Sequence, residues 1–151
     1  MRVVLVEDDH LQARWVTETL ERAFSHVKVV PVRTEAEFYS IIDGLGSKPP
    51  NVIIMDVMLR WTDPAPDMTI PPENVRREGF RRAGLRCVEK LLERDATKHI
   101  PVILFTVRSY GDLESPPDVE NVLYVSKESE PEELINRIRT ILSREQPQGS
   151  T

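Results

Sequence analysis

The chain has 151 residues, of which 40 % are apolar and 30 % are charged, as expected for one soluble globular domain. Its formal net charge of −5 gives no reason to expect binding to nucleic acid or to a membrane surface. The single cysteine, Cys87, excludes an internal disulfide, and no apolar stretch approaches the ~20 residues that span a bilayer. We expect a cytoplasmic protein in which residues 1–143 form one domain and residues 144–151 form a flexible tail.

The first predicted elements are a strand, a helix and a second strand. Residues 2–6 are a strand-like run, apolar from residue 3 onward, that leads into three acids, and residues 10–24 carry apolar side chains at helical spacing. An acid suits the N-cap of this helix, which accounts for one of the three acids but not for three in succession. The strand at residues 27–32 contains Pro31, which indicates an edge of the sheet because proline cannot donate to a central ladder.

A second helix and a buried strand come next. A capping box at residues 34–37 opens the helix, and the apolar run at residues 52–55 then ends in Asp56. Unbroken apolar runs are typical of strands that are covered on both faces, as in parallel sheets. The segment that follows, residues 57–82, contains four prolines and shows no clear period at first, so we expect an irregular insertion. Connections this long are usually functional or disordered.

A third helix is expected to begin between residues 73 and 84 and to end near Asp95. Five arginines in this region are interspersed with glutamates, which favours a solvated, ion-paired face over a dedicated anion site. These arginines are Arg76, Arg77, Arg81, Arg82 and Arg86.

The last part of the chain is predicted to be a strand, a compressed crossover, a strand and a helix. Strands are expected at residues 101–105 and 122–126. The crossover between them holds Gly111 and two consecutive prolines, so a short or absent fourth helix is expected. A second capping box, at residues 129–132, precedes the final helix. This β-α alternation predicts a doubly wound α/β fold with a parallel sheet and helices on both faces.

Polar side chains follow four of these strands. Because the carboxyl ends of parallel strands meet at one edge of a sheet, we expect these side chains to lie together. Clustered carboxylates offer only oxygen ligands, with no histidine nearby except His10, and so favour Mg²⁺. An ammonium and a hydroxyl suit the oxygens of a phosphoryl group. The residue types alone therefore suggest a Mg²⁺-assisted phosphoryl site with an aspartate as nucleophile. The side chains concerned are Glu7, Asp8, Asp56, Thr106 and Lys127.

The motifs at these strand ends resemble those of the receiver domain of two-component response regulators. They are Leu5-Val-Glu-Asp-Asp9, Ile53-Ile-Met-Asp56, Pro101-Val-Ile-Leu-Phe-Thr106 and Leu123-Tyr-Val-Ser-Lys127. The resemblance covers nearly the whole chain, with the motifs in the same order. It implies a flavodoxin-like sheet of five strands in the order 2-1-3-4-5.

The resemblance also implies roles for individual residues. Asp56 resembles the phosphoacceptor, Lys127 the lysine that pairs with the phosphoryl group, and Thr106 the hydroxyl that hydrogen-bonds it. Tyr124 resembles the aromatic residue that turns inward when the domain switches.

The implied cofactor is Mg²⁺. Asp8 and Asp56 resemble its direct ligands, Met58 would contribute its backbone carbonyl, and Glu7 would act through water. The implied phosphodonor is a histidine kinase or a histidine phosphotransfer protein. A downstream protein would bind according to the phosphorylation state of the domain. Both a monomer and a homodimer are compatible with the sequence.

Three features depart from the family pattern. Glu128 follows Lys127 where the family usually has a cis proline, so a trans bond and a displaced lysine are expected. The insertion at residues 57–82 replaces a short loop. The degraded fourth helix alters a face through which many receivers signal.

Three functions are compatible with these motifs and with the departures from the family pattern. The leading hypothesis is a stand-alone phosphoacceptor domain that is not an enzyme towards other substrates. The first alternative is a docking module that works without phosphorylation, which the insertion and Glu128 favour. The second is a phosphohydrolase with Asp56 as nucleophile. Phosphohydrolases of the haloacid-dehalogenase type place an acid two residues after the nucleophile, and Met58 at that position counts against it.

Overall fold

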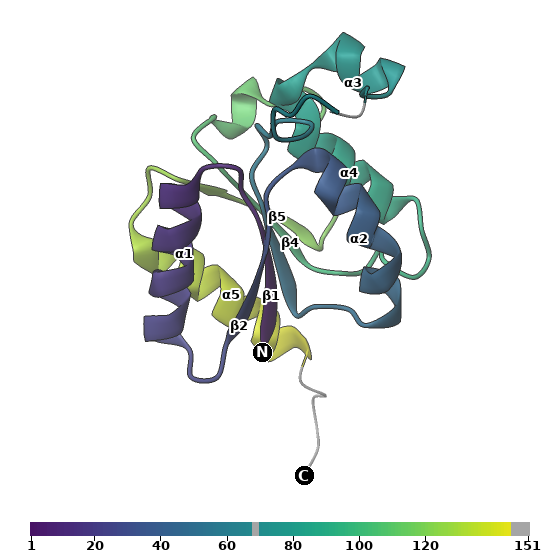
Figure 1. Cartoon of the computed structure of the whole chain (residues 1–151). Coiled ribbons are helices and arrows are strands. Elements are labelled where there is room, and N and C mark those ends of the chain that lie inside the picture. The colour runs from purple at the N-terminus through teal and green to yellow at the C-terminus, as the bar shows by residue number, and fades with distance from the viewer. Residues whose placement is uncertain (68–69, 146–151) are drawn as a thin grey trace.

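The fold is a central parallel sheet with helices on both faces (Figure 1). This computed structural model describes residues 1–67 and 70–145 of the chain. The five strands are parallel and lie in the order β2-β1-β3-β4-β5, which confirms the predicted flavodoxin-like arrangement. They span Arg2–Val6 (β1), Lys28–Val32 (β2), Val52–Met55 (β3), Val102–Thr106 (β4) and Val122–Ser126 (β5).

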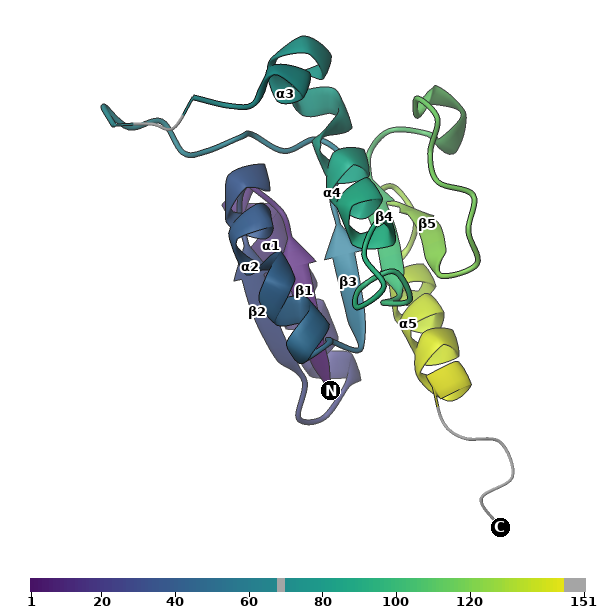
Figure 2. The ribbon, with the colours of Figure 1, turned by 90° about the vertical axis from the view of Figure 1, so that its right-hand side faces the viewer.

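The helices form two layers around this sheet. Helices α1 and α5 cover one face, and α2 and α4 cover the other, while α3 lies beyond the carboxyl ends of the strands (Figures 1 and 2). The α-helices span His10–Ala23 (α1), Glu35–Ser47 (α2), Glu73–Glu78 (α3), Ala83–Leu92 (α4) and Pro131–Glu145 (α5). The expected tail at residues 144–151 overlaps the end of α5, and residues 146–151 lie outside the described part of the chain. None of the helices formed by the described residues combines the length and the apolar character that a membrane span requires.

Alternation along β1 explains why its apolar run is unbroken. Val3 and Leu5 pack in the core beneath α1 and α5, whereas Val4 and Val6 pack in the core beneath α2 and α4. All four side chains are at most 2 % exposed. A strand that is covered on both faces needs an apolar residue at every position, so the sequence pattern directly reflects the layering.

The insertion at residues 57–82 is more ordered than its sequence predicted. Val57, Leu59 and Val75 are buried, and Val57 and Leu59 belong to the core beneath α2 and α4. The second half forms helix α3 and a 3-10 turn at Phe80–Arg82 (η1), so the expectation of an irregular segment was wrong there. Gly79 ends α3 with a φ of 81°, a left-handed conformation that glycine adopts without strain.

The crossover between β4 and β5 has no α-helix. Residues 107–121 contain only the 3-10 turn Tyr110–Asp112 (η2), which confirms the predicted loss of the fourth helix. Leu113 is the residue of this crossover that reaches the core beneath α2 and α4. Tyr110 and Val119 remain substantially exposed.

Candidate functional site

Three carboxylates meet where β1 and β3 end. Oxygens of Glu7, Asp8 and Asp56 lie within 4.8 Å of one another, and Glu7 and Asp56 are buried. Asp9, the third acid after β1, instead caps helix α1: its Oδ1 accepts the N–H groups of Leu11 at 2.9 Å and Gln12 at 3.0 Å. The run of three acids therefore divides between one helix cap and two members of the acidic cluster.

Lys127 completes this cluster from the end of β5. Its Nζ donates to Asp56 Oδ2 at 2.9 Å and to Glu7 Oε1 at 2.5 Å. Among the described residues no peptide bond is cis, so the bond between Lys127 and Glu128 is trans, as expected. The trans bond does not keep the lysine away from the cluster, because the Lys127 N–H continues the β4–β5 ladder by donating to the Thr106 carbonyl at 2.9 Å.

Burial and a neighbouring carboxylate make Glu7 harder to ionise than an ordinary glutamate. Burial first, and the charge of Asp56 second, raise the pKa of Glu7 to about 7. Burial alone would lower the pKa of Lys127, but the charge of Asp56 and the hydrogen bond to Glu7 outweigh it and raise that pKa. Lys127 is therefore a permanent positive charge held between two carboxylates.

The donor set fits a hard divalent cation. Three carboxylates supply only oxygen ligands and carry more negative charge than one lysine neutralises, which suits Mg²⁺ or Mn²⁺. A cavity of about 370 Å³ opens onto these groups. It is lined by Glu7, Asp8, Asp9, Gln12, Asp56, Met58, Phe80, Val107 and Lys127.

Of the other predicted site residues, Met58 lines this cavity, whereas Thr106 and Tyr124 do not. The Met58 N–H donates to Asp56 Oδ1 at 3.3 Å. Thr106 is fully buried at the end of β4, and its hydroxyl oxygen accepts the Arg108 N–H at 3.3 Å. Tyr124 is partly buried; its hydroxyl donates to the Arg108 carbonyl at 2.5 Å, and its ring packs edge-on against Tyr110. Thr106 and Tyr124 therefore both contact the backbone of the β4–β5 crossover at one residue.

Arg86 was misread from the sequence as part of a solvated face. Its guanidinium is 3 % exposed and forms a two-pronged ion pair with Glu35, at 2.7 and 2.8 Å, and Glu35 is fully buried. Glu78 of α3 contacts both Arg86 and Arg82, which ties the insertion to α4. No local pattern signals a pair between residues 51 positions apart.

Two contacts of the insertion with the site were also missed, one with the cavity and one with the acidic cluster. The aromatic side chain of Phe80 lies at the mouth of the cavity and is 58 % exposed. Arg60 contacts Asp8 through its backbone N–H at 3.1 Å and its guanidinium at 3.6 Å. Both residues lie in a segment without a clear period, where sequence patterns do not show which way a side chain points.

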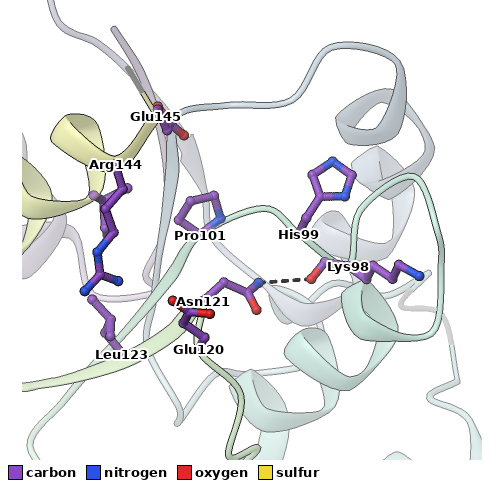
Figure 3. A pocket seen from close by; sticks show the side chains of 9 residues that line it. Lys98, His99, Pro101, Glu120, Asn121, Leu123, Arg144 and Glu145 are labelled. Carbon is purple, nitrogen blue, oxygen red and sulfur yellow. Dashed lines mark hydrogen bonds between the residues drawn. The ribbon is translucent and has the colours of Figure 1, made fainter. Parts of the chain in front are cut away.

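A second cavity, of about 380 Å³, lies at the opposite end of the strands (Figure 3). It combines an apolar floor around Pro101 and Leu123 with charged groups of both signs, such as Arg144 and Glu120. The Asn121 amide donates to the Lys98 carbonyl at 3.0 Å and so braces its rim. None of the three clustered acids lines this cavity.

Comparison with known proteins supports the fold strongly. No protein-family model matches the sequence, and no curated protein matches it significantly. Among solved structures, the signal receiver domain of a signal transduction histidine kinase from Syntrophus aciditrophicus is similar, with 22 % identity and a TM-score of 0.66 over 99 % of this chain and 96 % of that one. The receiver domain of a sensor histidine kinase from Pseudomonas aeruginosa, with magnesium in its active-site cleft, has 14 % identity and a TM-score of 0.65, covering 94 % of this chain and 97 % of that one.

A third similar structure is the Mn²⁺-bound form of the response regulator Rcp1, with 19 % identity and a TM-score of 0.62 over 94 % of this chain and 91 % of that one. All three matches extend over nearly the full length of both chains, and they agree with the strand order and with helices on both faces of the sheet. The chain therefore has the fold of a response regulator receiver domain.

Proposed function

We propose that this chain is a phosphoacceptor signalling domain of a two-component or phosphorelay system, with Asp56 as the acceptor. The observation that carries the proposal is the bridge that Lys127 forms between Asp56 and Glu7, inside a cluster that also contains Asp8. The four residues come from three separate strand ends, which a helix cap or a surface ion pair does not require. The proposed phosphodonor is a histidine kinase or a histidine phosphotransfer protein.

In the proposed reaction, a carboxylate oxygen of Asp56 attacks the phosphorus of a phosphohistidine. The new P–O bond forms an acyl phosphate as the P–N bond breaks, and its electron pair returns to the imidazole nitrogen. Lys127, already 2.9 Å from Asp56, stabilises charge on the transferred oxygens, and Thr106 donates a hydrogen bond to one of them.

The acidic cluster would hold Mg²⁺ through Asp8, Asp56 and the Met58 carbonyl, with Glu7 acting through water. Bound Mg²⁺ would neutralise charge on the phosphoryl oxygens. The residues fit this role because their donor atoms are oxygens, converge within 4.8 Å and carry excess negative charge.

The same contacts suggest how phosphorylation is reported. A phosphoryl group on Asp56 gives Lys127 and Thr106 a new partner, and Thr106 shares the backbone of Arg108 with Tyr124. We propose that this shared contact transmits the change to the β4–β5 crossover, where Tyr110 and Val107 are exposed to a downstream protein.

Labelling by acetyl phosphate, read by intact mass, tests the proposal. We expect the wild-type chain to gain one phosphoryl group with Mg²⁺ present, and Asp56→Asn to gain none. Asp67→Asn, which changes an exposed acid of the insertion, is the matched control and should be labelled like wild type. Equal labelling of wild type and Asp56→Asn would refute Asp56 as acceptor. No labelling of wild type, with rapid hydrolysis excluded, would favour a docking module that works without phosphorylation.

The affinity for Mg²⁺ is expected to rise with pH. Because burial and the charge of Asp56 raise the pKa of Glu7 to about 7, a proton competes with the cation below that pH. Calorimetric titration should therefore show about tenfold weaker binding at pH 6 than on the plateau above pH 8. The control is Glu7→Gln, which has no proton to lose and should bind with little pH dependence in this range. Equal wild-type affinities at pH 6 and pH 8 would contradict the proposed role of Glu7 in binding Mg²⁺.

A further inference from the structure

The insertion brings a positive charge onto Asp8. The Arg60 N–H donates to Asp8 Oδ2 at 3.1 Å, and the Arg60 guanidinium lies 3.6 Å from the same oxygen. The two contacts differ in origin, since one comes from the backbone and would survive any side-chain substitution except proline. The other depends on the arginine side chain.

Residue 60 is held in place by the first turn of α2. The Arg60 carbonyl accepts the Glu35 N–H at 3.0 Å, and the Trp61 carbonyl accepts the Ala36 N–H at 2.9 Å. These N–H groups have no partner within the helix, so the insertion satisfies them. The backbone therefore keeps residue 60 beside Asp8, and the side chain decides only which charge is placed there.

The Arg60 guanidinium lies near two carboxylates, those of Asp8 and Asp63. Its Nη1 lies 3.6 Å from Asp63, and the Arg60 side chain is 50 % exposed against 22 % for Asp8. A half-exposed ion pair is weak, and Asp63 offers the arginine another partner. The charge can thus leave Asp8 without unfolding the insertion.

We propose that Arg60 competes with a divalent cation for the carboxylate of Asp8, so that the insertion weakens cation binding at the acidic cluster. This inference rests on the proposed role of Asp8 as a metal ligand. A cation that binds Asp8 meets a guanidinium on the same oxygen, and the two positive charges repel each other at short range. Because the ion pair is half-exposed, Arg60 tunes the cation concentration at which the site fills and does not block the site.

The test is calorimetric titration with MgCl₂ at constant ionic strength. Arg60→Ala removes the charge but keeps the backbone N–H on Asp8, and it should bind Mg²⁺ about two- to fivefold more tightly than wild type. Arg60→Lys keeps the charge and should bind within about twofold of wild type. Arg77→Ala is the matched control: it removes an exposed arginine of the same insertion that forms no ion pair with any residue in the described ranges, and its affinity should not change.

Each of the following results would overturn the inference. Equal affinity of Arg60→Ala and wild type would show that the guanidinium does not compete, and weaker binding would show that it orients Asp8 instead. An equal gain in Mg²⁺ affinity in Arg77→Ala would show that the effect comes from the net charge of the protein and not from the contact with Asp8. If wild type binds Mg²⁺ and is labelled on Asp56, these results leave the proposed function intact. If wild type binds no Mg²⁺, the proposed metal site and this inference fail together.

Discussion

Arg86→Met is expected to lower the free energy of unfolding by about 3–5 kcal/mol, because it leaves the buried carboxylate of Glu35 without its countercharge. Arg86 makes two hydrogen bonds to Glu35, at 2.8 and 2.7 Å, and the side chains are 3 % and 0 % exposed. The Tyr39 hydroxyl also donates to Glu35 but carries no charge. Urea denaturation followed by circular dichroism measures the loss.

Two further variants separate burial from charge. Arg14→Met breaks an exposed pair with Glu18, whose side chains are 77 % and 49 % exposed, and should cost less than about 1 kcal/mol. Glu35→Leu combined with Arg86→Met removes both charges and should recover much of the stability lost in the single variant. A single variant as stable as wild type would contradict the prediction, as would a double variant no more stable than the single one.

Gly84→Ala is expected to destabilise the fold by about 3 kcal/mol or more, because α4 begins against the backbone of Asp56 and Val57. A Cβ at residue 84 would lie 2.0 Å from the Asp56 carbonyl oxygen and 2.7 Å from Val57 Cα. These are backbone atoms and cannot rotate away. The hydrogen bond from the Gly84 N–H to the Val57 carbonyl, at 2.8 Å, fixes this close approach.

The same variant should also impair labelling, because relief of the clash displaces Asp56. Unfolding in urea and the rate of labelling by acetyl phosphate, measured at a temperature where the variant is folded, report the two effects. Gly44→Ala is the control: nothing lies within 4 Å of its added Cβ, and an exposed helical position should gain up to about 1 kcal/mol. Wild-type stability and labelling in Gly84→Ala would show that α4 shifts freely.

The strands and the convergence of the site were predictable from local patterns. Unbroken apolar runs predicted β1 and β3 with their observed bounds, and a parallel sheet brings the residues after them to one edge. Asp56 and Lys127 are 71 positions apart, yet each lies directly after a strand of the sheet. A motif at a strand end therefore predicts both the chemistry of its polar residue and the position of that residue at the edge of the sheet.

Local patterns were less reliable for caps. The capping box at residues 34–37 forms in part: the Thr34 hydroxyl accepts the Glu37 N–H at 3.1 Å, but the Glu37 carboxylate accepts the N–H of Arg33. The second predicted box fails at its first residue, because the Ser129 hydroxyl donates to the Ser126 carbonyl. Serine competes for nearby backbone groups, and the turn after β5 decides the outcome.

The sequence by itself determined the strands and the acids, lysine and threonine that follow them, because period and strand length are local properties. The order of the strands came only from the resemblance of the strand-end motifs to those of receiver domains. Only the tertiary structure decided what the insertion does. It placed Arg60 on Asp8, Phe80 at the mouth of the cavity and Arg86 in a buried pair with Glu35. In a segment without a period, the direction of a side chain is set by the distant groups that it meets, and those groups are defined only once the chain has folded.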